Sequence, residues 1–412
     1  MRYRRAIVAI LSTIFCIVAR GWAQNALYPS QVSLYSQVSA ETNGMGGAGV
    51  SFVSDNALAV IANPAELGLF SLHGMLGASY MPPIPNQLGA FAVNAGMDLH
   101  RLWNTFPVRI GLGVGYSNPN YDYAYSGGAE SLLANSVTTD AANGVTIALG
   151  VDYFVKLGLG YTFKWATTEE TGGFRGYYKS TYTPDWGALL QIPVADIILN
   201  SDGSFTRSII GATPILNLTF GYSERNFGNY APGGLPGLPM EGDLGWNFQF
   251  GLETSVAGHP WNWLSFTWIR QVDAPLVFNG TNTSAYDQGL GSFKVFDNLF
   301  AGRPTGGVSI GKGWQVQIGQ FLYFRAGSAT GPEIPTYTTF GGSVRLDGLI
   351  KGLIFTDAIS AHDTIASFLL DHLDLQFDFS EANGEIVGPS SGNTSGIGFK
   401  WEPFESLTLA VK

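Results

Sequence analysis

The sequence predicts an all-β protein: a transmembrane antiparallel β-barrel of about 14 strands. Three observations lead to this prediction. Only 13% of the 412 residues are charged, whereas soluble domains carry about 25%. The chain is 13% aromatic and has 54 glycines, yet beyond the N-terminus it has no apolar run of the ~20 residues that a membrane helix needs. Most of the chain alternates apolar and polar residues, as the wall of a membrane barrel does.

The first segment, residues 1–23, reads as a signal peptide. Three arginines within the first five residues precede a short apolar stretch, and Gly21 and Ala23 supply the small residues of a signal-peptidase site. The short apolar stretch disfavours the alternative, an uncleaved membrane anchor. Cys16 is the single cysteine of the sequence and lies in this segment. A cleaved chain would therefore have no thiol for a disulfide, a nucleophile or a metal site.

Residues 73–412 carry the alternation that predicts the barrel. In DLGWNFQFGLETS, every second residue from Leu244 to Leu252 is apolar, and glycine, asparagine and glutamine lie between them. The stretches RIGLGVGYS, VKLGLGYTFKWAT and LDLQFDFSE repeat the pattern. A soluble β-sandwich also alternates, but the polar face would fill a sandwich core poorly. Trp and Tyr near the segment ends are typical of the aromatic girdles of membrane barrels.

A count of strand-like segments gives fifteen, including 314–326 and 405–411. Because bacterial single-chain barrels have an even number of strands, we expect fourteen. The stretches 117–143 and 274–302 are predicted to be long loops on the outer side. The stretch 356–372 could form a short helix in one connection.

The charge pattern and the motifs argue against several functions. The net charge is −10, and the sequence has no basic stripe, which argues against nucleic acid as a partner. The five histidines lack metal-site spacing such as H-E-x-x-H. We find no catalytic constellation and predict no catalytic residue, no metal site and no cofactor. An enzyme is therefore not expected.

One predicted strand offers candidate contacts for a ligand in the lumen. In WQVQIGQFLYFRAG, the residues Gln315, Gln317, Phe321 and Tyr323 share the predicted inward face. Two interpretations stay open: either inward aromatics fill space and inward glycines let the hatch pack on the wall, or a partly apolar interior holds a hydrophobic molecule. A wide water-filled pore would need rings of lumenal charge, which this chain can scarcely supply.

The stretch 44–67, GMGGAGVSFVSDNALAVIANPAEL, is irregular between the signal peptide and the first strand. It resembles the N-terminal motif of the FadL-type superfamily through its glycine lead and its Asn-Pro-Ala sequence. The matching positions are Gly44, Gly46, Gly49, Asp55, Asn63, Pro64 and Ala65. The resemblance implies a fourteen-stranded outer-membrane barrel with a hatch, here residues 24–72. It also implies transport of hydrophobic compounds such as long-chain fatty acids or aromatic hydrocarbons.

A second branch of the same group, the PorV/PorQ-type proteins, is similar in FGYSERNFGNY at 220–230. That resemblance implies an accessory or docking protein of a protein secretion system. The leading hypothesis is passive passage of small hydrophobic compounds across a bacterial outer membrane. The expected partners are membrane lipid and either a hydrophobic small molecule or a secretion-system protein.

The residues of the motif suggest how the hatch works. Its glycines allow tight turns and close approach to the wall. Pro64 restricts Asn63 to an extended conformation, which would present a polar amide inside the lumen. We expect the segment to close the barrel, and gating by its movement is a hypothesis.

Overall fold

The computed structural model describes residues 39–82, 88–101, 107–125, 136–171, 181–200, 212–227, 240–275, 293–304, 308–331, 336–383 and 392–402. The predicted signal peptide (1–23), the start of the predicted hatch (24–38) and the predicted strand 405–411 lie outside these residues.

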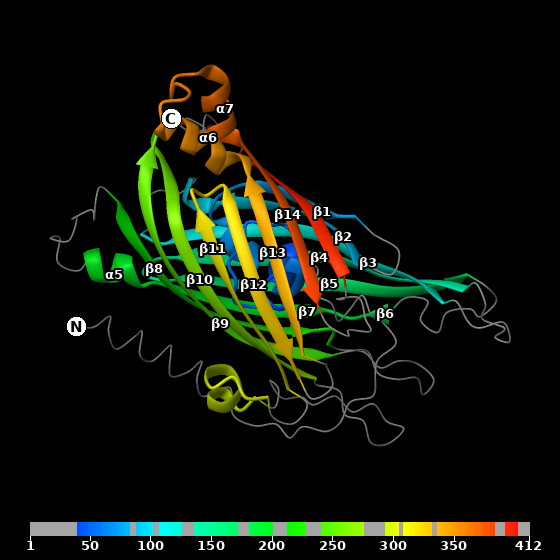
Figure 1. Ribbon diagram of the computed structural model, residues 1–412. Helices are drawn as coiled ribbons and strands as arrows, with labels where there is room; N and C mark the ends of the chain where they lie inside the picture. The colour runs from blue at the N-terminus through cyan, green and yellow to red at the C-terminus, as the bar shows by residue number, and fades with distance from the viewer. Residues whose placement is uncertain are drawn as a thin grey trace.

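The described residues form a closed antiparallel barrel (Figure 1). Its strands are β1 (Leu76–Met81), β2 (Leu88–Asp98), β3 (Arg109–Tyr125), β4 (Ser136–Asp152), β5 (Lys156–Thr171), β6 (Thr181–Tyr182), β7 (Asp185–Pro193), β8 (Thr213–Arg225), β9 (Glu241–Val256), β10 (His259–Pro275), β11 (Ser309–Ile318), β12 (Leu322–Thr330), β13 (Tyr337–Arg345), β14 (Leu373–Asn383) and β15 (Gly392–Trp401). Neighbours in the sequence pair with one another, and β1 pairs with β15 to close the ring. The two-residue β6 pairs with β5 beyond the end of β7, so fourteen strands surround the lumen in the described part of the chain. The predicted strand number is confirmed.

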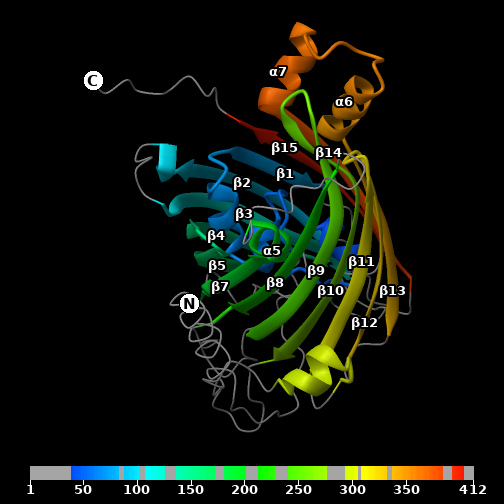
Figure 2. The same cartoon turned by 90° about the vertical axis from the view of Figure 1, so that its left-hand side faces the viewer.

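The barrel has two different ends. Turns at 153–155, 257–258 and 319–321 lie at one end, which we call the turn end. The first strand begins there and the last described strand ends there. The helices α5 (Val194–Asn200), α6 (Leu346–Phe355) and α7 (Thr364–His372) also lie at the turn end (Figure 2). None of the helices in the described ranges is long and apolar enough to cross a bilayer.

Two predictions from the sequence about strands and loops are wrong. The segment 314–326 is not one strand, because the chain turns at Gly319 and Gln320, which both have positive φ; a glutamine in this conformation gives no signal in the sequence. The stretch 117–143 is not all loop, because β3 continues to Tyr125 and pairs with β4 from Ser136. Its polar composition suggested a loop, but a strand pair that extends beyond a membrane needs no apolar face. The predicted helix within 356–372 is confirmed by α7.

The outer face of the wall is apolar. Large apolar side chains are exposed there on most strands, among them Phe91, Leu112, Ile147, Phe250, Phe266, Trp268, Trp314, Phe340, Phe377 and Ile397. Such a belt is the surface that lipid covers in a membrane barrel. The wall therefore spans a membrane.

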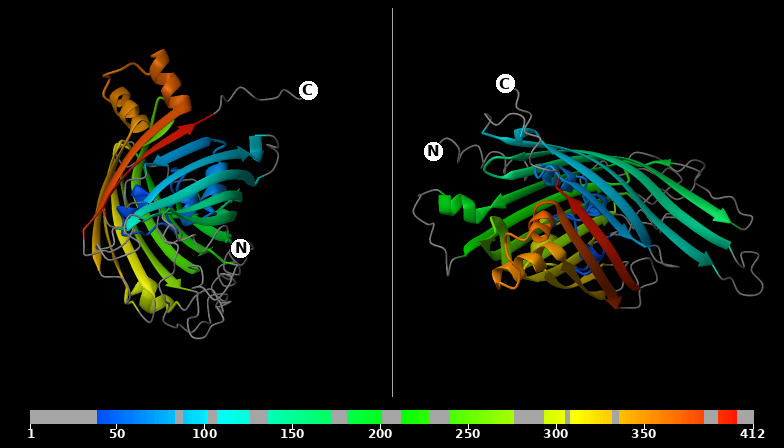
Figure 3. Two further views of the ribbon diagram at one scale, coloured as in Figure 1. Left: turned by 90° about the vertical axis from the view of Figure 1, so that its right-hand side faces the viewer. Right: turned by 90° about the horizontal axis from the view of Figure 1, so that it is seen from above.

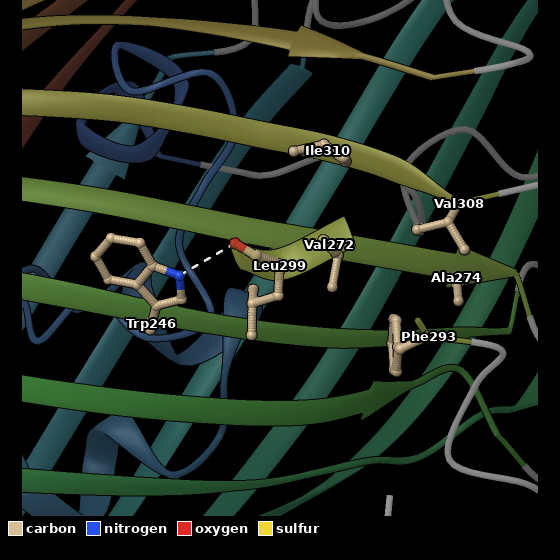
Figure 4. Packing of buried hydrophobic residues seen from close by; sticks show 7 residues of the cluster. All are labelled: Trp246, Val272, Ala274, Phe293, Leu299, Val308 and Ile310. Carbon is tan, nitrogen blue, oxygen red and sulfur yellow. Dashed lines mark hydrogen bonds between the residues drawn. The ribbon is translucent and has the colours of Figure 1, made fainter. Parts of the chain in front are cut away.

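Part of the predicted loop 274–302 folds back onto this outer face. The segment that contains the short helix η3 (Phe296–Phe300) covers outward residues of β9, β10 and β11 (Figure 4). Trp246 Nε1 donates a hydrogen bond to the Leu299 carbonyl oxygen at 3.3 Å, and Val272 is fully buried beneath the segment.

The lumen holds the hatch, whose described part is residues 39–72. It contains α2 (Ala40–Asn43), α3 (Ala59–Ala62) and α4 (Glu66–Ser71), drawn in blue inside the ring of strands (Figures 1 and 3). Apolar clusters join it to the wall; one of them contains Met45, Ala48 and Phe52 of the hatch with Ile269 of β10. The barrel with its N-terminal segment inside is the architecture that the FadL-type resemblance implies.

Inward glycines let the hatch lie directly on the wall. A Cβ atom built on Gly150, Gly160 or Gly221 would lie about 2 Å from a carbonyl oxygen of Gly68, Pro64 or Val50 respectively. Gly111 and Gly113, two glycines of the predicted inward face, likewise contact Ser71 and Leu67. The glycines of the wall thus serve close packing of two backbones, the first of the two interpretations left open by the sequence.

We expect Gly160→Ala to push the hatch away from β5, because the added Cβ would lie 2.1 Å from the Pro64 oxygen. Overpacking of this kind costs about 1–3 kcal/mol. The expected results are a lower melting temperature and a higher ion conductance in planar bilayers. Gly398→Ala is the matched control, since its Cβ would meet its nearest neighbour at an ordinary 3.5 Å. Equal behaviour of the two variants would contradict this packing.

Candidate functional site

The glycine-rich start of the hatch is bound to the wall strands β10 to β13. Gly46 has φ 73°, and its N–H donates a hydrogen bond to Thr339 Oγ1 at 2.8 Å. The N–H groups of Gly49 and Val50 both donate to Gln271 Oε1, at 2.7 and 2.8 Å. A Cβ on Gly46 would lie 2.5 Å from the Ser328 oxygen. A larger residue would therefore be excluded here by both its φ and the available space.

The Asn-Pro-Ala sequence fixes the middle of the hatch. Asn63 is extended, as predicted, and fully buried. Its Nδ2 donates to the Val50 oxygen at 2.7 Å, and its Oδ1 accepts from the Ala65 N–H at 3.0 Å. The amide is directed at backbone groups and not at open lumen, so it stabilises the fold of the hatch and is not available to a passing molecule.

An ion cluster around Arg325 ties α2 to the wall. Arg325, on β12, is completely buried. Its guanidinium donates to Glu41 Oε1 of the hatch at 2.8 Å and to Gln315 Oε1 at 2.6 Å. It also donates to Ser343 of the neighbouring strand β13 and to Asp378 of β14. Removing one partner from such a cluster leaves an uncompensated buried charge, which costs about 3–5 kcal/mol.

A second ion cluster holds Asp55. Its Oδ2 accepts from Lys400 Nζ at 2.8 Å and from Arg345 Nη2 at 3.2 Å. Lys400 and Arg345 also share Asp374 of β14. The two clusters connect opposite ends of the segment 41–55 to the strands β12 to β15.

Ser54 joins two buried carboxylates of the hatch. Its hydroxyl donates to Glu41 Oε2 at 2.5 Å, and its N–H donates to Glu66 Oε2 at 3.4 Å. Burial raises the pKa of Glu41 in spite of Arg325. Burial also raises the pKa of Glu66 well above its usual value, and the charges of Glu41 and Asp55 add to the rise. The pKa of Asp55 is instead held far below its usual range, chiefly by Lys400.

A polar cavity of about 170 Å³ lies between the hatch and the turn end. Amide side chains dominate its lining: Gln191, Asn247, Gln249, Asn262, Gln315, Gln317, Gln320 and Gln376. Phe52, Ser54 and Asp55 of the hatch close one side. Thr219 Oγ1 and Asn262 Oδ1 border the cavity and have no hydrogen-bond partner among the described residues. The cavity is suited to water or a polar solute.

The structure brings together four of the residues that the sequence singled out. Gln315, Gln317 and Tyr323 line the cavity with Asp55, whereas Phe321 lies in the turn between β11 and β12. The sequence analysis missed Glu41, Arg325, Arg345 and Lys400. The inward positions of the three basic residues follow from strand alternation, but their pairing with the hatch does not.

Comparisons with known proteins give the following. No protein-family model matches the sequence, and no curated protein matches it. Among solved structures, the chain is similar to the Pseudomonas putida toluene transporter TodX at 12% identity, covering 90% of this chain and 98% of that one, with a TM-score of 0.35. It is similar to the CymD monoaromatic hydrocarbon channel at 11% identity (89% and 97% covered, TM-score 0.36). It is also similar to OccAB1 from Acinetobacter baumannii at 10% identity, covering 79% of this chain and 94% of that one, with a TM-score of 0.29. The assignment of a function therefore depends on the geometry of the lumen and the wall.

Asn63→Ala should loosen the hatch more than it destabilises the barrel. It leaves the Val50 oxygen and the Ala65 N–H without the amide, at a cost of about 1–3 kcal/mol. We expect higher ion conductance with an unchanged fraction of folded, heat-modifiable barrel on gels. Asn217→Ala is the control, because it removes only a bond to Gln249 within the wall. An equal loss of folded barrel with Asn63→Ala would show the motif to be structural alone.

The raised pKa of Glu66 predicts that acid tightens the hatch. A carboxyl whose pKa is higher in the docked state favours docking below its ordinary pKa, and this contribution is lost as the pH rises through the raised pKa. Conductance should therefore increase as the pH rises above the ordinary range of a glutamate carboxyl. Glu66→Gln, which is neutral and similar in shape, should keep conductance low at high pH. Each unit by which the pKa of Glu66 is raised corresponds to about 1.4 kcal/mol of docking free energy that the parent loses at high pH and the variant keeps.

Asp55→Asn provides the contrast to Glu66→Gln. Because Lys400 keeps Asp55 ionised, this variant should raise conductance across the whole pH range by removing one of the two carboxylates that Lys400 and Arg345 share. The Glu66 interpretation fails if Glu66→Gln retains the pH dependence of the parent.

Proposed function

We propose that this chain is a hatch-closed channel of the bacterial outer membrane that lets small hydrophobic compounds pass without an energy source. The proposed cargo resembles the compounds in the names of TodX, a toluene transporter, and CymD, a monoaromatic hydrocarbon channel. The hatch supports a closed resting state, because its backbone lies on inward glycines of the wall and the carboxylates of Glu41 and Asp55 are paired with Arg325, Arg345 and Lys400.

The polar cavity argues that a hydrophobic compound does not travel the full length of the lumen. A hydrophobic cargo would displace the water that hydrogen-bonds to the lining amides and could not form those hydrogen bonds itself. Burying amide groups without hydrogen bonds costs free energy. An apolar route must therefore leave the lumen before the cavity, through the wall.

One observation carries this proposal: an apolar groove of about 410 Å³ on the outer face, lined by residues of the successive strands β1, β15, β14 and β13 and by Pro82 after β1. Its lining consists of Tyr80, Pro82, Val344, Phe377, Phe379 and Ile397, completed by Asp378, Ser395 and Gly396. Gly396 leaves room in the wall, since an added Cβ would come no closer than 3.5 Å to any other atom.

The inner side of β1 near the groove is also apolar. Ala57 and Leu58 of the hatch pack there against Met81, Ala90 and Ala92 of β1 and β2. A shift of residues 57–58 would expose this cluster next to the groove. The hatch and the wall thus supply apolar surface on both sides of the same strands.

Uptake by proteoliposomes tests the proposal. We expect a radiolabelled fatty acid or aromatic hydrocarbon to enter vesicles that contain the barrel faster than empty vesicles. Ile397→Trp fills the groove and should slow this uptake several-fold. Ile147→Trp on β4 is the matched control, since Ile147 is 50% exposed and Ile397 is 49% exposed.

Two results would overturn the proposal. The first is uptake of the hydrophobic probe that is no faster than in empty vesicles. The second is equal uptake by both tryptophan variants. Retention of secretion proteins by the purified barrel, together with the first result, would support the accessory role instead.

A further inference from the structure

The connection between β13 and β14 is a helical hairpin of α6 and α7. In the views from either side it stands outside the outline of the barrel, at the turn end (Figures 2 and 3). We propose that this hairpin is a membrane-interface anchor, whose exposed apolar face lies among the lipids of the leaflet at the turn end. The proposal does not depend on which compound the barrel passes.

The side of the hairpin next to the barrel is firmly attached. Ile350, Ile354 and Ala366 pack with Val256 and Trp261 in one buried cluster. A Cβ on Gly348 would lie 2.3 Å from the Gln320 oxygen, so α6 lies directly on the turn between β11 and β12. The position of the hairpin relative to the wall is therefore fixed.

Polar bonds reinforce this attachment. Lys351 Nζ donates to the Pro260 oxygen at 2.9 Å and to Asp347 Oδ2 at 3.0 Å. Gln320 Nε2 donates to the same Asp347 oxygen at 3.2 Å. The charged groups of α6 thus face the barrel, and the opposite side of the helix is left without charge.

That opposite side is apolar and exposed. Leu349 and Leu353 of α6 are each 38% exposed there, whereas Phe355, at the end of the helix, is 60% exposed but packs beside Trp261 of the barrel, with ring centroids 4.9 Å apart. On α7, Ile365 is 71% exposed and Phe368 43%. Leu349, Leu353, Ile365 and Phe368 are thus four large exposed apolar side chains on one small hairpin, and exposed apolar surface of this kind marks contact with a membrane or a protein.

The patch continues the lipid-facing belt of the wall, which identifies lipid as its occupant. Ile397 and Phe399 are exposed on the outer face of β15, and Trp401 is the next residue on that face. The rings of Phe368 and His372 lie 6.0 and 5.6 Å from the Trp401 ring. Tryptophan at the end of a membrane strand is typical of the lipid headgroup level, so α7 extends the wall at that level.

The charges indicate how the hairpin would bind. Lys351 is the single cation of residues 346–371 apart from the histidine His362, and it is buried. The connecting segment carries Asp357 and Asp363, and Asp371 pairs with His259 at 3.1 Å. Without exposed lysine or arginine, the hairpin gains nothing from anionic lipids. Insertion would be driven by apolar burial and should not depend on salt.

Site-directed fluorescence tests the anchor. With Cys16 changed to serine, single cysteines can be introduced as Leu349→Cys, Ile365→Cys and, in the lipid-facing belt, Phe377→Cys. Ser360→Cys marks the polar connecting segment. Each would carry a bimane label in phosphatidylcholine nanodiscs, with quenching measured for doxyl-labelled lipid and for iodide. Folding would be checked by heat-modifiable migration.

We expect labels at 349 and 365 to be quenched by the doxyl lipid as strongly as the label at 377. Iodide should quench the label at 360 several-fold more than these, and neither salt nor phosphatidylglycerol should change the pattern. Strong iodide quenching at 349 and 365 without lipid quenching would overturn the proposal. Protection that appears only with two barrels per disc would also overturn it, in favour of contact between copies of the chain.

Discussion

Close packing of the hatch backbone on inward glycines is the constraint on which the rest of this structure depends. A barrel wall satisfies its own backbone hydrogen bonds, but an irregular segment inside it must find its partners elsewhere. Glycines on β3, β4, β5 and β8 bring the two backbones within reach of one another. The Asn63 amide and Gln271 then supply bonds to groups that the hatch itself leaves unpaired. Without these glycines the hatch would not fit in the lumen.

The hatch is held differently on its two sides. Residues 63–72 lie against β3 to β5 and β7 mainly through van der Waals contact with glycines. Residues 41–55 also pack on wall glycines, but here Glu41 and Asp55 add ion pairs to Arg325, Arg345 and Lys400. Packing of the first kind responds little to pH, whereas carboxylates with raised pKa values respond strongly. Glu41 lies in the segment 41–55 and Glu66 in residues 63–72, and burial raises the pKa of both, so a change of pH acts on both parts of the hatch.

The sequence alone predicts the wall better than its contents. Alternation such as that of Leu244 to Leu252 indicates which face of a strand meets lipid, because a strand in the membrane needs apolar residues on that face along its whole length. It does not report the turn at Gln320, where a non-glycine residue adopts positive φ. The Asn-Pro-Ala motif located the hatch, since proline and its neighbour restrict the backbone locally. The bond between Glu41 and Arg325 joins residues 284 positions apart, and no local signal encodes such a pair.

The opposite polarity of the two faces of the wall determines which routes are open to a cargo. Outside, apolar residues run from the groove at Ile397 to Trp401 and the α6–α7 hairpin. Inside, amides line the cavity between the hatch and the turn end. A hydrophobic molecule that enters from the end opposite the turn end would reach the apolar cluster around Leu58 before it reached those amides. On the proposed route the molecule would move sideways there into the groove, because the amides beyond would lose hydrogen bonds to water, and a hatch packed on the wall glycines would keep the polar lumen closed.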